Sequence, residues 1–599
     1  MDNQARVLHL QAEEMAREDS LRHWSLLVQY TSGVMKVAFE LAGALALTAL
    51  AVVIGVAMYN AANEDGVIIE AFSVPSDLAN KGITGQAVAA QILDRLSYMQ
   101  SATRSSRPAA SYSNNWHNDI KVQIPNTGVS ISDAYRLLAS WLGHQTVVSG
   151  EVYRTDTGLA VTARATGVGG ATVTGTDKQL ANLLSQAAET IYEETQPFRY
   201  ATYRINTRGG RDSLARSLFE SLAASDSVEE RFWAYGGLRA MDQFKDWRLP
   251  RADALAQIAI KPDSPIGYAN LLLPETVFGH DEAVVSAAQK IAGLASADTT
   301  AAGRAFVRNN SPTYRARVAV VLADYPAAIA AWIDAQHSAR PDVRAAARTS
   351  FPVLYALVHD PAGSDPAFDR VPRTPTDEAT RTIAAVIAGD WQRAIRSAQT
   401  AGASYRRAGY SPLATEQYLY GFVHPWVAFS YAQLGEFARA HAEIDHAPLD
   451  NYSCTYVRGV IASLEHNWRT ADYWFGRAIA QAPSIGIAFY RWGESYAARG
   501  DFDDAIAKLI IAHAKAPHYA EPLELWGEIL VAKNRSDLSL VKFQEAAQYA
   551  PNWGRLHLKW GEALLWLGRK EEARAQFAIA SSLYLSDADH AQLLRVRHV

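Results

Sequence analysis

The chain contains almost no cysteine and no excess of basic residues. Cys454 is the single cysteine among 599 residues, so no disulfide can form within the chain. Its position inside an expected helix favours a small buried hydrophobic side chain over a reactive thiol. The formal net charge is −5, and no dense run of lysine and arginine is present. Because nucleic-acid binding needs a basic surface, we expect no nucleic-acid partner.

The short motifs of common catalytic and metal sites are also missing. No HExxH, no paired CxxC and no GxSxG occurs in the chain. His359, Asp360 and Asp365 lie in a loop rich in proline and glycine, but a metal there would need further ligands from elsewhere. We therefore expect no catalytic residue, no cofactor and no metal site, while a catalytic set dispersed over the fold stays open. Four glycines between expected strands lack the Lys-Ser or Lys-Thr of a phosphate-binding loop and predict a hairpin turn: Gly167, Gly169, Gly170 and Gly175.

What the chain does contain is a regular repeat in its last third. Glycine and proline each recur at a 34-residue step, and three of the four glycines belong to a Trp-Gly-Glu triplet. A fixed period in the mid-thirties is typical of stacked helical hairpins, whose long concave surface suits binding rather than chemistry. The recurring positions are Gly459, Gly493, Gly527 and Gly561, and Pro483, Pro517 and Pro551.

The unit Phe489–Pro517 shows what each position does. Gly493 and Ala505 let two helix backbones approach, Gly500 supplies the positive φ that ends the first helix, and Pro517 stops the second. Large side chains between them fill the space between hairpins: Trp492, Tyr496, Phe502 and Leu509. This pattern resembles the tetratricopeptide repeat, which implies two antiparallel helices per unit.

The resemblance implies an array over residues 421–599 and degenerate helical repeats over residues 205–420. The weaker echoes in the second range lie at Gly389-Asp390-Trp391 and at Asp324-Tyr325. The unit at Gly527 is predicted to be a looser hairpin, because polar residues replace the expected glycine, aromatic residue and alanine: Asn534, Ser536 and Ser539.

A long apolar run near the N-terminus predicts a membrane anchor. Nineteen residues without a charge, Leu41–Tyr59, would form a helix of about 28 Å, close to the hydrocarbon thickness of about 30 Å. The alternatives are a buried helix of a folded domain and a cleaved signal peptide. We expect a transmembrane helix over residues 37–60. Basic residues precede the run, which predicts a cytoplasmic segment 1–36 and a periplasmic remainder at a bacterial inner membrane: Arg6, Arg17, Arg22 and Lys36.

Between the anchor and the repeats, residues 66–200 predict a small α+β domain. Val67–Phe72 reads as a strand, Thr84 caps a helix, and residues 146–154 and 159–166 alternate as a β-hairpin. A further strand is expected at 120–124, a helix at 130–142, and a loop over 101–118. The order of elements and the hairpin resemble the TolB amino-terminal domain, which implies an extracytoplasmic placement.

In the tetratricopeptide repeat, the residue after the helix-crossing glycine faces the concave surface, and the residue four positions earlier lies beside it. The predicted partner-binding groove is therefore acidic with aromatic patches. We expect it to take a neutral or basic peptide or helix; the alternative is that glutamate is only a good helix former on an exposed face. The groove positions are Tyr456, Tyr490, Glu494, Glu524, Glu528, Leu558, Glu562 and Trp566, with Val460 in the first unit.

The expected fold class is mostly α: a single transmembrane helix, a small α+β domain, then an α-solenoid of tetratricopeptide-like hairpins. The leading function is a non-enzymatic, membrane-anchored periplasmic scaffold that binds protein or peptide partners of unknown identity. One alternative is a transmembrane receptor whose α+β domain senses a ligand. The other is an enzyme with an unrecognised site in residues 66–200.

Overall fold

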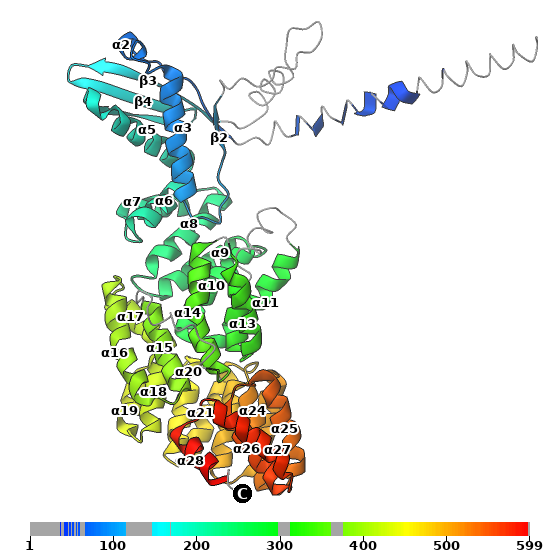
Figure 1. Ribbon diagram of the computed structural model, residues 1–599. Coiled ribbons are helices and arrows are strands. Elements are labelled where there is room, and N and C mark those ends of the chain that lie inside the picture. Colours follow the sequence, from blue (N-terminus) through cyan, green and yellow to red (C-terminus); the bar gives the residue numbers. More distant parts are fainter. Residues whose placement is uncertain are drawn as a thin grey trace, which may run out of the picture. The chain divides into compact units, whose positions relative to one another are not determined.

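A computed structural model describes residues 66–114, 146–167, 169–297, 312–338, 340–360 and 375–596, together with scattered positions between 36 and 59 (Figure 1). The chain divides into two compact units. Unit 1 comprises residues up to Ala102 and Ala109–Pro197, and unit 2 comprises Thr103–Pro108 and Phe198–Val599. Each unit is described by itself below.

The predicted transmembrane helix over residues 37–60 is wrong. Within the part of the chain that the structure describes, no helix is both long enough and apolar enough to cross a membrane. The predicted location at a bacterial inner membrane, with the remainder in the periplasm, depended on this helix and is corrected with it.

Unit 1 is built on a five-stranded sheet in the order β2-β1-β3-β4-β5. Strand β1 pairs in parallel with both β2 and β3, whereas β3, β4 and β5 form an antiparallel meander. Helix α5 packs on β4 and β5, and α3 packs on α5 and β2. The elements are β1 Val67–Ile69, α2 Ser76–Ala79, α3 Gly85–Ala102, β2 Tyr112–Asn114, β3 Thr146–Thr155, β4 Gly158–Ala165, β5 Gly169–Gly175, η1 Asp177–Gln179 and α5 Leu180–Thr195.

The apolar periods of the sequence account for these elements. Val88, Ile92 and Leu96 lie on one face of α3 and are fully buried, as their spacing of four predicts. Gly167 lies in the turn that connects β4 to β5, as predicted, whereas Gly169, Gly170 and Gly175 belong to strand β5 itself. Part of the loop expected over 101–118 instead forms the edge strand β2. The strand expected at 120–124 and the helix expected at 130–142 lie outside the described residues.

Unit 2 is a succession of helices, most of them paired as antiparallel hairpins (Figure 1). Its first part contains α6 Pro197–Arg208, α7 Ser213–Ala223, α8 Val228–Asp242, α9 Arg248–Ile260, α10 Pro265–Phe278, α11 Asp281–Ala297, helical residues 312–321, α13 Tyr325–Gln336, α14 Pro341–Leu357, α15 Pro375–Ile387 and α16 Trp391–Arg407.

The second part of unit 2 contains the regular repeats and confirms helical hairpins there. Its elements are α17 Pro412–Phe422, α18 His424–Gln433, α19 Phe437–Ile444, α20 Tyr452–Leu464, α21 Trp468–Gln481, α22 Ile487–Ala498, α23 Phe502–Lys515, α24 Ala520–Ala532, α25 Ser536–Tyr549, α26 Gly554–Trp566, α27 Lys570–Ser582 and α28 Asp587–Val596.

One residue in the left-handed conformation ends the first helix of each regular hairpin. Gly500 and Gly568 have φ of 86° and 75°, as expected of glycine after a helix. His466 and Asn534 adopt φ of 58° and 57° at the equivalent positions. The unit at Gly527 therefore keeps the hairpin turn without a glycine, because asparagine tolerates this conformation.

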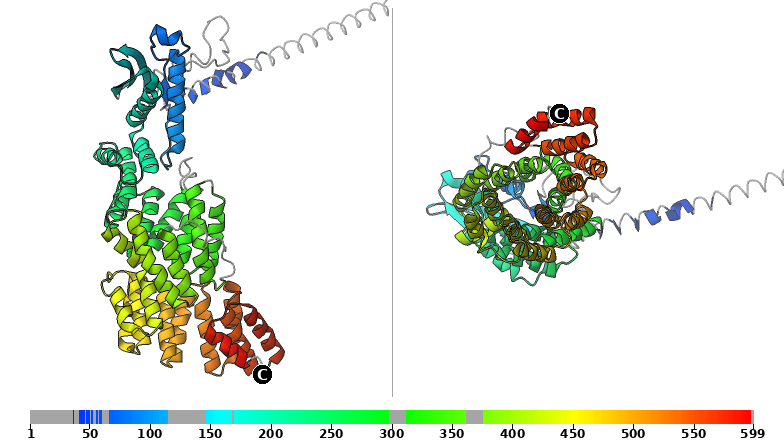
Figure 2. Two further views of the ribbon diagram at one scale, coloured as in Figure 1. Left: turned by 60° about the vertical axis from the view of Figure 1, so that its left-hand side comes forward. Right: turned by 90° about the horizontal axis from the view of Figure 1, so that it is seen from below.

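Successive turns of unit 2 also contact one another. Gln417 donates to Asp246 over 2.9 Å, Asn552 donates to Asp360 over 2.9 Å, and the Tyr584 hydroxyl donates to the Ala388 carbonyl over 2.9 Å. Such partners lie 162 to 202 residues apart, about five or six units of 34 residues. Figure 2 shows the helices of unit 2 arranged around a common axis. Unit 2 is therefore a superhelix whose turns are bonded to one another.

Candidate partner-binding surface

The eight predicted groove residues lie on the first helices of successive hairpins. Tyr456 is on α20, the pair Tyr490 and Glu494 is on α22, Glu524 and Glu528 are on α24, and the remaining three are on α26: Leu558, Glu562 and Trp566. Neighbouring first helices pack on each other in the order α20, α22, α24, α26. The equal 34-residue step therefore places equivalent side chains on one side of the array.

These residues differ strongly in exposure. Tyr456, Tyr490, Glu524 and Leu558 are buried. Glu494, Glu528 and Glu562 are partly buried, whereas Trp566 is 78% exposed. A partner could contact Trp566 directly, but it could not reach the four buried side chains without a rearrangement.

The chain's own residues cover the array near Tyr490. Tyr325, at the start of α13, packs edge-on against Tyr519, whose ring packs edge-on against Tyr490 in turn. Burial raises the pKa of all three phenols well above its usual range. This contact joins two turns of the superhelix, so the surface at Tyr490 is occupied within the chain.

Glu494 has two partners on its own helix. The Tyr490 hydroxyl donates to its Oε1 over 2.7 Å, and Arg491 donates to its Oε2 over 2.7 Å. The Arg491 guanidinium also lies 5.3 Å from the centre of the Phe429 ring. The charge of Glu494 is therefore balanced locally by a cation that is held against an aromatic ring.

Arg555, at the start of α26, gathers three carboxyl groups. Its Nε lies 3.1 Å from Glu524, its Nη1 donates to Asp589 over 3.0 Å, and its Nη2 donates to Glu528. Burial, followed by the neighbouring Glu528, raises the pKa of Glu524 well above its usual range. The proton held by Glu524 and the charge of Arg555 lower the pKa of Glu528 despite its burial. Of this pair, Glu524 therefore holds a proton more readily than Glu528 does.

Lys559 and Gln592 extend this network to Glu562. Lys559 Nζ lies 3.3 Å from Glu562 and 4.0 Å from Glu528, and Gln592 on α28 donates to Glu562 over 2.5 Å. Four carboxyl groups on the first helices and Asp589 on α28 thus face three cationic side chains: Arg491, Arg555 and Lys559. The surface keeps an acidic excess, but most of its carboxylates already have partners.

Sequence reasoning identified the glutamates and missed the cations. Arg491 and Lys559 each precede a predicted glutamate by three positions, a spacing that places both side chains on one helix face. That signal was available in the sequence. The pairing of Arg555 with Glu524, Glu528 and Asp589 joins three helices, so it could be recognised only from the three-dimensional structure.

Two residues of the candidate metal loop, His359 and Asp360, are described, and both contact the regular repeats. The His359 ring stacks on Trp553 at 3.9 Å between centroids, its Nε2 lies 3.2 Å from Glu521, and Asp360 accepts a hydrogen bond from Asn552. Asp365 lies outside the described residues. Among the residues that the structure describes, no group of three or more His, Cys, Asp and Glu could hold a metal ion.

Comparisons with known proteins give limited information. No protein-family model matches the chain, and no curated protein matches it. Two crystal forms of MamA AMB-1, P212121 and C2221, are 20% and 21% identical to it, cover 26% and 27% of it and 95% and 96% of their own chains, with TM-scores of 0.23 and 0.22. The APC/C hetero-tetramer Cut9-Hcn1 is 12% identical, with 70% of this chain and 94% of its own covered and a TM-score of 0.35.

Sequence identities and TM-scores this low support no conclusion about function. The resemblance of residues 66–200 to the TolB amino-terminal domain stays a prediction.

Proposed function

We propose that the chain is a non-enzymatic scaffold that binds a protein partner through the first helices of its regular hairpins. The partner segment is a neutral or basic peptide or helix. It lies along the surface formed by Glu494, Glu528, Glu562 and Trp566, which we call the acidic face. Membrane anchoring forms no part of this proposal.

The observation that carries the proposal is the exposure of Trp566 at the end of a surface with excess carboxylate. A tryptophan that is 78% exposed leaves a large apolar area in water, and such residues are enriched where proteins meet. Its neighbour Leu567 is also exposed. The acidic excess along α22, α24 and α26 favours basic or neutral groups in the segment that covers it.

Site-specific photo-crosslinking in the native cell tests the proposal. A benzophenone side chain at position 567 keeps Trp566 intact and should crosslink to one segment of one protein. The control position is 473, because Tyr473 is an exposed aromatic on α21, a second helix of its hairpin. Equal crosslinking from both positions, or none from position 567, would contradict the proposal. Crosslinking to an acidic segment would contradict the charge assignment alone.

A further inference from the structure

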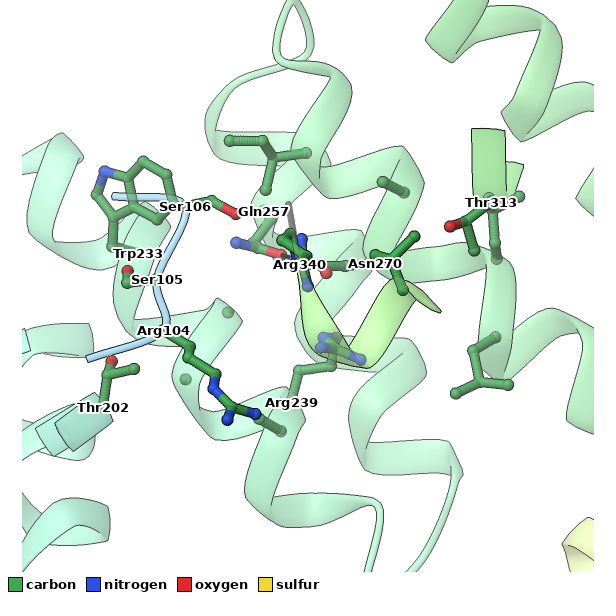
Figure 3. A pocket seen from close by; sticks show the side chains of 18 of the residues that line it. Arg104, Ser105, Ser106, Thr202, Trp233, Arg239, Gln257, Asn270, Thr313 and Arg340 are labelled. Carbon is green, nitrogen blue, oxygen red and sulfur yellow. Dashed lines mark hydrogen bonds between the residues drawn. The ribbon is translucent and has the colours of Figure 1, made fainter. Parts of the chain in front are cut away.

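Unit 2 contains a cavity of about 460 Å³ among its N-terminal helices, distant in sequence from the acidic face. Its walls come from the short segment Arg104–Ser106, from helices α6, α8, α9 and α10, from helical residues 312–321, and from the start of α14. This volume lies within the range of small-molecule sites. Figure 3 shows Arg104, Arg239 and Arg340 approaching it from three different segments.

The charges around the cavity have one sign. Four arginines line it, and no aspartate or glutamate is found among the described residues of its wall: Arg104, Arg239, Arg317 and Arg340. Arginine is suited to carboxylate and phosphate groups because its planar fork can donate two parallel hydrogen bonds. A cavity lined in this way has the chemistry of an anion site.

Among the residues that the structure describes, no carboxylate forms an ion pair with Arg239 or Arg317. Arg239 Nε is buried and has no hydrogen-bond partner in the described structure. Burial lowers the pKa of both guanidinium groups, and the groups that act on Arg317 are the phenols of Tyr418 and Tyr314 rather than carboxylates. A partly buried guanidinium group without a carboxylate partner is costly, so a bound anion would stabilise it.

Asp253 is the carboxyl group that acts on Arg239, and it is a weak counter-charge. Its Oδ2 is buried without a hydrogen-bond partner. Burial and the neighbouring Asp242 raise the pKa of Asp253 to about 7, so it is partly protonated at neutral pH. Asp242 itself is already paired with Arg216.

Tyr314 shows that the arginines converge. Burial raises the pKa of its phenol to about 12, and Arg340, Arg239 and Arg317 each act in the opposite direction. Three guanidinium groups are therefore within electrostatic reach of one hydroxyl in the cavity wall. The Oγ1 of Thr313, the adjacent residue, is buried without a hydrogen-bond partner and offers a further donor.

The remainder of the cavity wall consists of apolar and aromatic side chains together with the amide side chains of Gln257 and Asn270. Phe198 and Trp233 pack together at 5.8 Å between ring centroids. Gln257 bridges the Phe232 carbonyl and Asn270 with hydrogen bonds of 2.8 Å, which fixes its amide. The cavity therefore combines rigid apolar contacts with concentrated positive charge.

We propose that this cavity binds a small organic anion. The ligand carries carboxylate or phosphate groups that meet Arg239, Arg317 and Arg340, and an apolar body that packs against Phe198 and Trp233. This site is independent of the acidic face, and it adds a small-molecule ligand to a protein-binding scaffold.

Calorimetric titration of the full chain at constant ionic strength tests the proposal with four probes. Phenyl phosphate and phthalate combine a ring with phosphate or carboxylate charge, inorganic phosphate supplies charge alone, and benzyl alcohol supplies a ring alone. We expect the two aromatic anions to bind at millimolar concentration or below, inorganic phosphate more weakly, and benzyl alcohol not at all. If phenyl phosphate binds more tightly than phthalate, the site prefers phosphate; if phthalate binds more tightly, the site prefers carboxylate.

Variants locate the binding. Arg239→Gln and Arg317→Gln should each weaken binding of the better aromatic anion by about tenfold or more, because each removes a charge-assisted hydrogen bond. Arg239→Lys keeps the positive charge, so this variant should lose less affinity for the anion than Arg239→Gln does. Arg574→Gln is the control, since Arg574 is an exposed residue of α27 paired with Glu571. Absence of anion binding to the unsubstituted protein overturns the proposal, as does equal binding by the Arg239 and Arg574 variants.

Discussion

At the scale of single residues, the repeat glycines are explained by what a side chain would meet. A Cβ built at Gly527 would come within 2.5 Å of the Phe543 ring, and one at Gly459 within 2.8 Å of the Phe475 ring. Each phenylalanine follows its glycine by sixteen positions and packs where the two helices cross. The 34-residue period predicted these glycines, and the structure shows the phenylalanine that each of them meets.

Gly527→Ala should lower the free energy of unfolding by about 2 kcal/mol, because the buried phenylalanine cannot move without disturbing the hairpin crossing. Gly476→Ala is the matched control on α21. Nothing lies within 4 Å of a Cβ there, so this change should stabilise the protein by about 0.5–1 kcal/mol. Urea denaturation of both variants measures the difference. Equal stability of the two variants would contradict the close approach.

Asp253 predicts a pH dependence of stability. Its folded pKa of about 7 lies above the unfolded value near 3.9, so it contributes stability below about pH 4 that is lost as the pH rises to about 7. Asp253→Asn should remove this loss. At pH 8 the free energy of unfolding of this variant should exceed that of the wild type by about 1–2 kcal/mol, a value reduced for partial solvent exposure. Thermal unfolding between pH 4 and pH 8 measures it; parallel profiles would refute the shifted pKa.

The arginine cavity was not visible in the sequence. Arg104, Arg239, Arg317 and Arg340 are separated by up to 236 positions and share no motif or spacing. Their juxtaposition depends on how seven segments of unit 2 pack, and a net charge of −5 gives no hint of a local positive cluster. Local pattern predicts helix faces, whereas a cavity lined by several helices requires tertiary structure.

At the scale of elements, the hairpins were predictable because each is specified locally. Apolar spacing and a left-handed residue at the turn recur in each regular unit, and several helices also begin with a capping side chain. Asp390 caps α16 and Asn467 caps α21 through their side-chain oxygens. The looser hairpin expected at Gly527 is instead regular, since Ser536 and Ser539 are buried within it.

His424 links three helices. It begins α18, its Nδ1 lies 2.6 Å from Glu443 on α19, and its Nε2 lies 3.6 Å from Glu416 on α17. Burial alone would lower the pKa of His424, but the two glutamates raise it to about 9. The imidazolium therefore stabilises the junction of α17, α18 and α19 at neutral pH.

This junction predicts a second pH effect. A histidine with a raised folded pKa contributes stability that is complete below about pH 6.5 and lost as the pH rises through about 9. His424→Gln should lack this contribution, on the order of 2 kcal/mol, and should show a flatter profile between pH 6 and pH 10. Guanidinium denaturation across that range is the measurement. A variant that keeps the wild-type slope would exclude His424 as its source.

At the scale of the whole molecule, unit 2 differs from an open solenoid. In an open solenoid each repeat contacts only its neighbours. Here residues up to 202 positions apart are hydrogen-bonded, and Tyr325 packs against the inner aromatic residues of a later turn. The sequence could not reveal these contacts, because a repeat period specifies neighbours but not the superhelix. The same limit applies to the membrane prediction, which read an apolar run without its structural context.

Gly279 tests the bonding between turns. It follows α10 with φ of 69°, its carbonyl accepts from the Tyr452 amide over 2.9 Å, and an added Cβ would meet Asn451 at 2.5 Å. Gly279→Ala should therefore cost about 2–3 kcal/mol through backbone strain and a broken contact.

The control is Gly435→Ala, because Gly435 has φ of 75° but no atom within 4 Å of an added Cβ. That variant should lose about 1 kcal/mol from strain alone. Native-state hydrogen exchange should show faster exchange in α20 for the Gly279 variant and not for the control. Unchanged exchange in α20 would mean that the two turns are not coupled.

The most direct test of the account is a binding titration at the acidic face. The segment crosslinked from position 567 is synthesised as a peptide and titrated into the wild type, Trp566→Ala and Tyr473→Ala. We predict that Trp566→Ala raises the Kd by about tenfold or more, as for an interface anchor, while Tyr473→Ala leaves it unchanged. Equal affinity of the wild type and Trp566→Ala would contradict the assignment of this surface as the partner-binding site.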